Sequence, residues 1–441
     1  MEPDASVALE MADFIVRAPS PFHVTAEVVR RLTAAGFSPA SGAVQGETGR
    51  GYVVREGTVI AWCAPGTVTE ATPVRIVAAH TDSPTLKVKP RPDVGAAGWV
   101  QVGVEVYGSP LWNSWLDRDL GVSGRLALLD GSATLVNIDR PLLRVPQLAP
   151  HLDRGVNQRG LQLDPQRHLL PVWGTGKPRD GELIEFLAAE AGLEAAEVAA
   201  HDLVLHDLTR PALLGRDREL LAAPRLDNLS STYCGLAGFL AATAAGGSED
   251  AILVYAAFDH EEVGSRSATG VAGPLLEAVL RHVWPAYQRA LLPDSAAMTN
   301  SLCLSADAMN AVHPNYVEYH DPEHTAVPGG GPAVKFNAAQ HYGTDALGAA
   351  AWARACRQAG VPSQTFVSRN NVQCGATIGP VVAARTGIRT VDVGIPVLSM
   401  HSARELCGTA DPAYLKAACT AFLAPALTTQ TDAVGRETGH R

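Results

Sequence analysis

Residues 252–262 read ILVYAAFDHEE, and this stretch decides the fold. The apolar run 252–258 has the length of one strand and carries no polar residue on either side of the pleat, which is typical of a strand buried on both faces. The run ends in Asp259-His260-Glu261-Glu262. Two adjacent acids ordinarily form a solvated turn, but at the end of a central strand they face the rim where open α/β sheets bind ligands.

Helical and strand patterns alternate around this stretch. Residues 8–35 place apolar residues three and four apart, as helices do, whereas 52–62 and 74–80 are short β-branched runs. A helix is predicted at 228–245, before the strand, and another at 274–287, after it. The alternation predicts an α/β fold with a mixed central sheet flanked by helices.

The pattern differs between about residue 95 and about residue 210. GWVQVGVEVYG at 98–108 alternates with period two, and SGRLALLDGSATLVNI at 123–138 reads as a hairpin that turns at Asp130-Gly131. These residues predict a β-rich domain, 95–210, inserted into a discontinuous α/β domain made of 1–94 and 211–441. The polar tail from Thr428 is expected to fray.

Length and composition narrow the class of protein. The 441 residues are 46% hydrophobic and 18% charged, an ordinary globular composition. The net charge of −10, without a basic stripe, predicts no nucleic-acid partner. No apolar run approaches the ~20 residues that cross a bilayer, so no membrane association is expected, and the acidic N-terminus is unlike a signal peptide. Seven scattered cysteines without a Cys-x-x-Cys pair indicate a reducing, cytoplasmic location.

Three other apolar runs also end in a histidine or an acid. VRIVAA at 74–79 is followed by His80, SLCLSA at 301–306 by Asp307, and TVDVGIPVLSM at 390–400 by His401. Asp82 follows His80 closely enough to accept the second ring N–H of that imidazole.

A fifth acid, Asp227, stands where a loop enters the predicted helix, and it or Ser230 could cap that helix. Imidazoles and carboxylates without thiolates, with more acids than one ion needs, match a two-metal site. The residues alone leave this site and a set of capping and surface side chains equally open.

Signatures of other chemistries are weaker. The sequence contains no Gly-x-Ser-x-Gly elbow and no His-Glu-x-x-His, and its glycine-rich stretches at 46–52 and 327–334 lack the nucleotide-binding patterns. Cys374 has no identifiable base beside it, which favours a packed thiol over a nucleophile.

A set of short segments in a fixed order resembles the aspartyl aminopeptidase family of cocatalytic zinc metallopeptidases. The resemblance covers nearly the whole chain and includes WLDRDLGVSGR (115–125) and HLLP (168–171) in the insert. The segments are HTDSP (80–84), PRLDNL (224–229), DHEEVGS (259–265), SADAMNAVHPNY (305–316), GPAVKFNAAQHYGTD (331–345), CGATIGP (374–380) and MHSARE (400–405).

The resemblance implies two divalent metal ions per subunit, Zn²⁺ foremost, with Mn²⁺ or Co²⁺ as alternatives. His80 and Asp307 would hold one ion. Glu262 and His401 would hold the other, and Asp227 would bridge both. Glu261 would be the general base for the attacking water. Adjacent residues on extended backbone point opposite ways, which would let Glu261 and Glu262 divide these tasks.

The resemblance also implies an assembly and a substrate pocket. The β-rich insert would be a dimerisation domain, and dimers would build a closed homododecamer. His151, in LAPHLDR, matches a histidine that a neighbouring subunit lends to the site. Lys335 and Tyr342 match positions that line the substrate pocket, where a lysine suits an acidic side chain. Without the resemblance, Lys335 would be expected on the surface.

The implied function is that of a cytoplasmic aminopeptidase that removes one N-terminal residue, preferably Asp or Glu, from short peptides with a free N-terminus. Asn310 stands where the family usually has His, and Asn371 where it usually has Asp; both bear on the acidic preference and not on hydrolysis. Two alternatives remain, a two-metal deacylase or amidohydrolase on small N-acyl compounds and a non-catalytic self-assembling scaffold. The presence of Glu261 and of every ligand argues against the scaffold.

Overall fold

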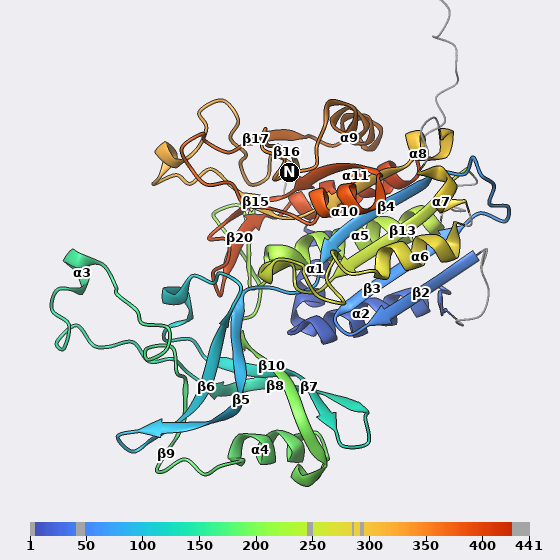
Figure 1. Cartoon of the computed structure of the whole chain (residues 1–441). Coiled ribbons are helices and arrows are strands. Elements are labelled where there is room, and N and C mark those ends of the chain that lie inside the picture. The colour runs from blue at the N-terminus through green and yellow to red at the C-terminus, as the bar shows by residue number, and fades with distance from the viewer. Residues whose placement is uncertain (1–4, 41–48, 245–249, 285, 292–294, 426–441) are drawn as a thin grey trace, which may run out of the picture.

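The chain folds into an α/β body with a β-rich extension beneath it (Figure 1). The computed structural model describes residues 5–40, 49–244, 250–284, 286–291 and 295–425. The tail predicted from Thr428 lies outside these ranges. No helix within them is long and apolar enough to span a bilayer.

The central sheet is parallel in its middle. Its strand order is β1-β2-β3-β13-β4-β14-β18-β16-β17, and the pairs β13–β4, β4–β14 and β14–β18 are all parallel. The carboxyl ends of these four strands therefore lie at one edge of the sheet. The strands are β1 (Ser38–Pro39), β2 (Gly49–Arg55), β3 (Thr58–Ala64), β13 (Ile252–Phe258), β4 (Val74–His80), β14 (Leu302–Ala306), β18 (Arg389–Gly394), β16 (Ala333–Phe336) and β17 (Gln364–Val367).

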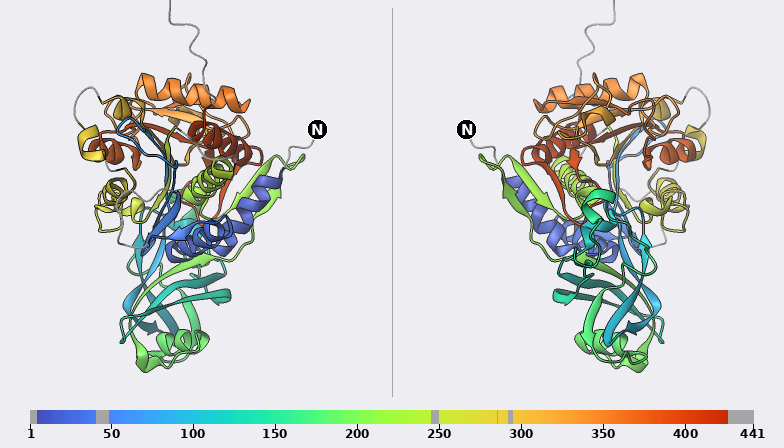
Figure 2. Two further views of the ribbon diagram at one scale, coloured as in Figure 1. Left: turned by 90° about the vertical axis from the view of Figure 1, so that its right-hand side faces the viewer. Right: turned by 90° about the vertical axis from the view of Figure 1, so that its left-hand side faces the viewer.

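Helices cover both faces of this sheet (Figures 1 and 2). Strand β13 shows why its sequence is apolar throughout: Leu253 and Tyr255 pack into one core, while Val254 and Phe258 pack into the other. The first core includes α1 (Ser6–Arg17), α2 (Pro21–Ala34), α5 (Leu226–Ala244), α9 (Ala346–Ala359) and α11 (Asp411–Leu423). The second includes α6 (Leu275–Val283), α7 (Tyr287–Ala290), α8 (Ala296–Asn300) and α10 (Gly379–Thr386).

The extension is an antiparallel sheet with its own core, ordered β8-β7-β10-β5-β6-β9. The hairpin predicted at Asp130-Gly131 joins β7 to β8. This sheet begins at Thr85, earlier than the predicted boundary at residue 95, and the domain division itself stays a prediction. Its elements are β5 (Thr85–Ala96), β6 (Trp99–Tyr107), β7 (Leu120–Leu128), β8 (Ala133–Leu143), β9 (Val172–Thr175), β10 (Val198–Asp207), α3 (Val156–Arg159) and α4 (Glu182–Glu190).

A small sheet divides the apolar run 390–400 into two strands. β18 belongs to the central sheet, but β19 (Pro396–Leu398) pairs with β20 (Glu405–Gly408) and β15 (Met309–Asn310) instead. The run that leads to His401 is therefore not one continuous strand. Pro396 lacks the N–H that a central ladder needs, so the chain leaves the central sheet there. The small sheet is completed by β11 (Ala212–Leu214) and β12 (Leu220–Ala223).

Candidate metal centre

The parallel strands bring three of the predicted site segments to one place. β13 and β4 are in register to their last residues, Phe258 opposite His80, and β14 lies on the other side of β4. His80 at the end of β4, the acids just after β13, and Asp307 just after β14 therefore meet at the carboxyl edge of the central sheet. This is the rim that the sequence indicated.

Asp227 and His401 reach the same edge from irregular backbone. Asp227 has non-helical φ and ψ of −83° and 106° within the first turn of α5, and the Asp227–Asn228 peptide is cis. Ser230 donates its hydroxyl to the carbonyl of Leu226, so the structure shows a back-bonded serine there and no N-cap. His401 follows β19 in a turn with φ of 65°.

The two imidazoles and the carboxylates lie at distances that suit a metal ion between them. His80 Nε2 is 3.4 Å from Asp227 Oδ1 and 3.6 Å from Asp307 Oδ1. His401 Nε2 is 3.4 Å from Asp227 Oδ2 and 3.6 Å from Glu262 Oε2. Ligands about 2.0–2.1 Å from a tetrahedral zinc ion are roughly 3.3 Å apart, close to these values. The group His80, Asp227 and Asp307 could therefore hold one ion, and the group Asp227, Glu262 and His401 another. These two groups are called the triads below.

Buried polar atoms without partners support this fit. Among the described residues, Asp227 Oδ1 and Glu262 Oε1 accept no hydrogen bond. Leaving a buried carboxylate oxygen unpaired is costly, so a cation between these groups would relieve the cost. Each triad offers nitrogen and oxygen ligands without sulfur, a donor set that zinc accepts.

The electrostatics of the site favour positive charge. Burial opposes protonation of His80, but the carboxylates of Asp227, Asp307 and Asp82 raise the pKa of this imidazole well above its usual value. Burial likewise opposes, and Asp227 supports, a charged His401, whose pKa rises to about 10. Burial raises the pKa of Glu262 well above its usual value, with Asp227 adding to the effect. A metal cation would supply the charge that protons otherwise bring.

Asp82 organises the cluster from behind. Its carboxylate accepts hydrogen bonds from the backbone N–H groups of Glu261 and Glu262, each 3.1 Å long, and from the Tyr107 hydroxyl, 2.8 Å away. His80 Nδ1 lies 3.0 Å from the Asp82 carbonyl and 3.4 Å from its carboxylate. The residue that contacts His80 Nδ1 is the predicted one, but the hydrogen bond is to the backbone carbonyl of Asp82 and not to the carboxylate that was expected.

Glu405 is a positioning residue that the sequence reasoning missed. Its buried carboxylate accepts the backbone N–H of Asp227 at 2.9 Å and that of His401 at 2.7 Å. Burial, with Asp227 adding to it, raises the pKa of Glu405 to about 8. Its place four residues after His401, in an otherwise apolar strand, was the available signal.

Glu261 and Glu262 do not lie on extended backbone, which corrects the expectation for this pair. They form a 3₁₀ turn, Glu261–Val263, directly after His260. Because such a turn has three residues per turn, neighbouring side chains diverge by about 120°. Glu262 faces His401, while Glu261 Oε2 lies 3.9 Å from His80 Nε2. The two acids therefore do not point opposite ways as expected: with His80 they offer ligand atoms that all lie within 4.8 Å of one another.

The cluster opens into a cavity of ≈ 720 Å³. Lys335 and Tyr342 both line it, and Lys335 is only 2% exposed. Lys335 donates to the carbonyl of Ala308 at 2.8 Å and lies 3.9 Å from Asp307 Oδ2. Its Nζ is also 5.3 Å from the centre of the Tyr342 ring. The surface position that the residue would have without the resemblance is excluded.

The remaining predicted residues divide into two groups. Asn310 lines the cavity at the end of β15, whereas Asn371 lies in the neighbouring exposed turn and is not a lining residue. His151 is exposed in the insert and does not line the cavity of its own chain.

Histidines and carboxylates gathered at a sheet edge, with one acid beside the ligands, define the site of a metal-dependent hydrolase. The family model for aminopeptidase I zinc metalloproteases (M18) matches residues 14–423. The chain therefore belongs to the M18 family of zinc aminopeptidases, which confirms the resemblance seen in the sequence.

Individual relatives agree with this assignment. The chain is 55% identical over 417 residues to a probable M18 family aminopeptidase 2 of Streptomyces avermitilis, covering 94% of this chain and 96% of the relative. It is 46% identical over 432 residues to the protein of the same description from Mycobacterium tuberculosis H37Rv, covering 96% and 99%.

Solved structures confirm the predicted fold class, a mixed sheet flanked by helices. A cryo-EM structure of an Ape4–Nbr1 complex matches with a TM-score of 0.88 and 34% identity, covering 95% of this chain and 85% of that chain. The S. cerevisiae mApe1 dodecamer matches with a TM-score of 0.81 and 27% identity, covering 95% and 96%.

Proposed function

We propose that the protein is an aminopeptidase with two divalent ions per chain, Zn²⁺ foremost and Mn²⁺ or Co²⁺ as alternatives. His80 and Asp307 would hold one ion. Glu262 and His401 would hold the other, and Asp227 would bridge them. The observation that carries this proposal is the division of the Asp227 carboxylate: Oδ1 lies 3.4 Å from His80 and Oδ2 3.4 Å from His401.

Glu261 would act as the general base. When bound, the ions would polarise the scissile carbonyl and lower the pKa of the attacking water. Burial, with Asp307 and Asp227 adding to it and His80 opposing it, raises the pKa of Glu261 to about 8, near the working range of a base at neutral pH. Its carboxylate would take a proton from the water and return it to the amine nitrogen as the C–N bond breaks. The hydrogen bond from the Glu261 N–H to Asp82 fixes the backbone of this residue.

The preferred substrates would be short peptides that begin with Asp or Glu. Lys335 supports this preference because it is a buried cation in the wall of the cavity. Its carbonyl partner, Ala308, leaves the ammonium two further donors for a substrate carboxylate. Asn310, in the same wall, adds a hydrogen-bonding amide without charge.

Self-association would complete the site and would restrict the enzyme to small peptides. We place the protein in the cytoplasm. The mApe1 relative is a dodecamer, and we extend that assembly, built from dimers through the insert, to this chain. His151 would then reach the site of a neighbouring subunit, which accords with its exposure on the insert. A closed assembly would admit short peptides and exclude folded proteins.

The decisive experiment compares wild-type and Glu261→Gln proteins on a panel of aminoacyl substrates, with and without a chelator. Glu261→Gln should retain its metal and lose about 10²–10⁴-fold in kcat, since general-base catalysis contributes that much. Glu277→Gln, an acid on α6 that pairs with Arg281 and Arg385, is the matched control and should keep its rate.

The outcomes separate the alternatives. A Glu261→Gln rate above a tenth of the wild-type rate would remove this residue from the role of base. Hydrolysis of N-acetylated substrates in preference to those with a free amine would identify a deacylase. A wild-type protein with full metal and no hydrolysis of any substrate would identify a scaffold.

A further inference from the structure

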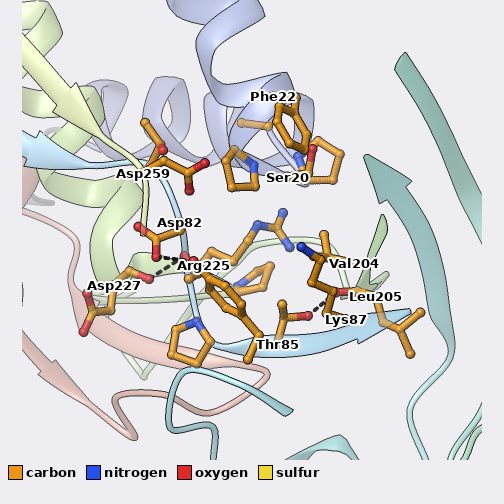
Figure 3. Close-up of a pocket in the computed structure, with 18 of the residues that line it drawn as sticks. Ser20, Phe22, Asp82, Thr85, Lys87, Val204, Leu205, Arg225, Asp227 and Asp259 are labelled. Carbon is orange, nitrogen blue, oxygen red and sulfur yellow. Dashed lines mark hydrogen bonds between the residues drawn. The ribbon is translucent and has the colours of Figure 1, made fainter. Parts of the chain in front are cut away.

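A second cavity lies behind the metal cluster, between the α/β body and the insert sheet (Figure 3). Its volume is ≈ 210 Å³. That is below the ~300–1,000 Å³ of sites for drug-sized ligands, so a ligand here must be small. Asp227 and His401 line both this cavity and the one that holds the cluster.

Much of the wall is apolar. Side chains from the turn between α1 and α2, the start of α2, the insert and the turn before α5 contribute to it. They are Pro19, Pro21, Phe22, Pro84, Trp115, Val204, Leu205 and Pro224. This surface suits an aliphatic or aromatic group.

Most charged groups of the wall already have partners. Lys87 and Arg125 both donate to Asp202, and Arg125 also pairs with Glu56. Asp207 accepts from Arg118 and Thr209. The carboxylates of Asp82 and Glu405 accept the backbone hydrogen bonds described above. Each of these charged groups is paired within the protein, so none of them is evidence for a bound ligand.

Besides Asp227, whose free oxygen is assigned to the metal cluster, two ionisable groups of opposite sign in the wall remain incompletely paired. Arg225 donates from Nη2 to the carbonyl of Ile15 at 2.9 Å, but its buried Nε has no partner among the described residues. Asp259 is 3% exposed; its Oδ1 accepts only the N–H of His260, at 2.9 Å, and its Oδ2 lies 3.8 Å from the ring of that histidine. Figure 3 shows both side chains directed into the cavity, Asp259 from the end of β13 and Arg225 from the turn before α5.

We propose that this cavity binds a free α-amino acid with an apolar side chain. The guanidinium of Arg225 would take the carboxylate, with which it can form charge-assisted hydrogen bonds. Asp259 would take the ammonium group, and the apolar wall at Phe22 and Val204 would take the side chain. A simple anion would meet the excess of carboxylates around it, whereas a zwitterion adds no net charge.

The chemistry of the wall carries the binding proposal by itself. The aspartate or glutamate that the proposed function would release does not fit the apolar wall, so the ligand would be a different free amino acid and the site does not depend on the acidic preference. Through the shared residues Asp227 and His401, a ligand bound in this cavity would lie beside the cluster.

Calorimetric titration of L-leucine into the zinc-loaded protein tests the proposal. Leucinamide lacks the carboxylate and 4-methylpentanoate lacks the ammonium group. Each should bind at least about tenfold more weakly than leucine, because a charged hydrogen bond is lost. Val204→Phe identifies which binding event belongs to this cavity. The larger side chain fills the cavity and leaves Arg225 and Asp259 in place, so leucine binding at this site should disappear in the variant.

A charge variant gives an independent reading. Arg225→Met should weaken leucine binding at least about tenfold, whereas Arg179→Met, which removes an exposed arginine paired with Glu185, should leave it unchanged. If the proposed function is wrong but this site exists, one leucine still binds per chain and is lost in Val204→Phe. If leucine binding is the same in wild type, Arg225→Met and Val204→Phe, or if the two analogues bind as tightly as leucine, the proposal is overturned.

Discussion

Two stretches of the chain have similar local sequences, but their histidines lie in opposite electrostatic environments. VAAHTD (77–82) and LVLHD (203–207) are both apolar strands that end in a histidine followed by an aspartate. His80 of the first lies among carboxylates that raise the pKa of its ring. His206 of the second is buried with no partner for either ring nitrogen among the described residues, and burial, with Arg225, His23 and Arg210 adding to it, lowers its pKa well below the usual value.

Strand direction explains the difference. β4 lies among parallel strands, so the ends of β13 and β14 bring further acids to His80. β10 lies between antiparallel neighbours: His206 lies opposite Gly121 near the beginning of β7, and β5 likewise begins at this edge, so neither neighbouring strand ends beside His206. A metal site needs several converging ligands, and parallel strands supply that convergence where antiparallel ones do not.

The largest expected effect comes from replacing one aspartate near each histidine: Asp227, which lies beside His80, and Asp207, which follows His206. Asp227→Ala should lose metal from both positions and reduce activity to background, because each ion keeps two ligands and the anion between the cations is gone. Elemental analysis checks this. Asp207→Ala, the matched control, should keep its metal and lose only about 1–3 kcal/mol of unfolding free energy through the unpaired Arg118. Two equivalents of metal in Asp227→Ala would contradict the bridge.

His151 extends the comparison to a histidine that is exposed. His151→Phe and Glu261→Gln proteins should each be nearly inactive alone. When the two are refolded together, about one site in four should combine a sound base with a sound neighbouring histidine, so activity should return to roughly a quarter of the wild-type rate. Mixed assemblies as inactive as their parents would make His151 a structural residue of the insert.

Lys335 tests whether a positive charge beside the cluster selects acidic substrates. Lys335→Leu should reduce kcat/KM for Asp and Glu substrates roughly 30- to several-thousand-fold, the ~2–5 kcal/mol of a desolvated charge contact, and affect Ala and Leu substrates far less. Lys87→Leu, which removes the partner of Asp202 in the insert, should not discriminate between substrates. An equal loss of kcat/KM on all substrates would mean that Lys335 positions Asp307 and does not contact the substrate side chain. Asn310 would then be the next residue to test for substrate preference.

The smallest effect concerns the histidines beside Arg225. Burial, with Arg225 adding to it, lowers the pKa of His23 to about 4. The unfolded chain, with an ordinary pKa near 6.5, then binds a proton that the folded chain refuses, so stability present above pH 6.5 is lost as the pH falls towards 4. Between pH 7 and pH 5, His23→Gln should remove about 2 kcal/mol of this dependence, because the unfolded histidine gains its proton over roughly 1.5 pH units of that range at about 1.4 kcal/mol per unit. Urea unfolding at pH 7 and pH 5 measures it, with His168→Gln as the exposed control; equal pH dependence in wild type and His23→Gln would refute it.

Local sequence was enough where a proposed ligand follows a central strand. His80 ends β4, Asp307 comes directly after β14, and Glu262 lies four residues beyond Phe258, the last residue of β13, so parallel pairing brings them together. The same reasoning placed Asp82 beside His80. The alternation of strands and helices was equally sufficient for the central sheet, since β13 is buried on both faces as its composition indicates.

Other features depend on contacts that sequence spacing does not encode. Pro396 marks where the chain leaves the central sheet, but the pairing of β19 with β15, which lies far back along the chain, could not be read from the sequence. Tyr107 supports the cluster from the insert, far in the sequence from every site residue, and the position of Glu405 four residues after His401 does not by itself show that its carboxylate accepts the N–H of Asp227. The incomplete pairing of Arg225 and Asp259 is visible only once every neighbour has been placed.

Glu405 has a consequence for how the protein acquires its metal. One carboxylate, through its two oxygens, accepts the backbone N–H of Asp227, the proposed bridging ligand, and that of His401, a proposed ligand of the second ion. The first ion to arrive would fix Asp227, and through Glu405 it would also draw His401 into place for the second ion. Filling is then expected to be cooperative: at half the required zinc, the population would consist of full and empty chains, with few that hold a single ion.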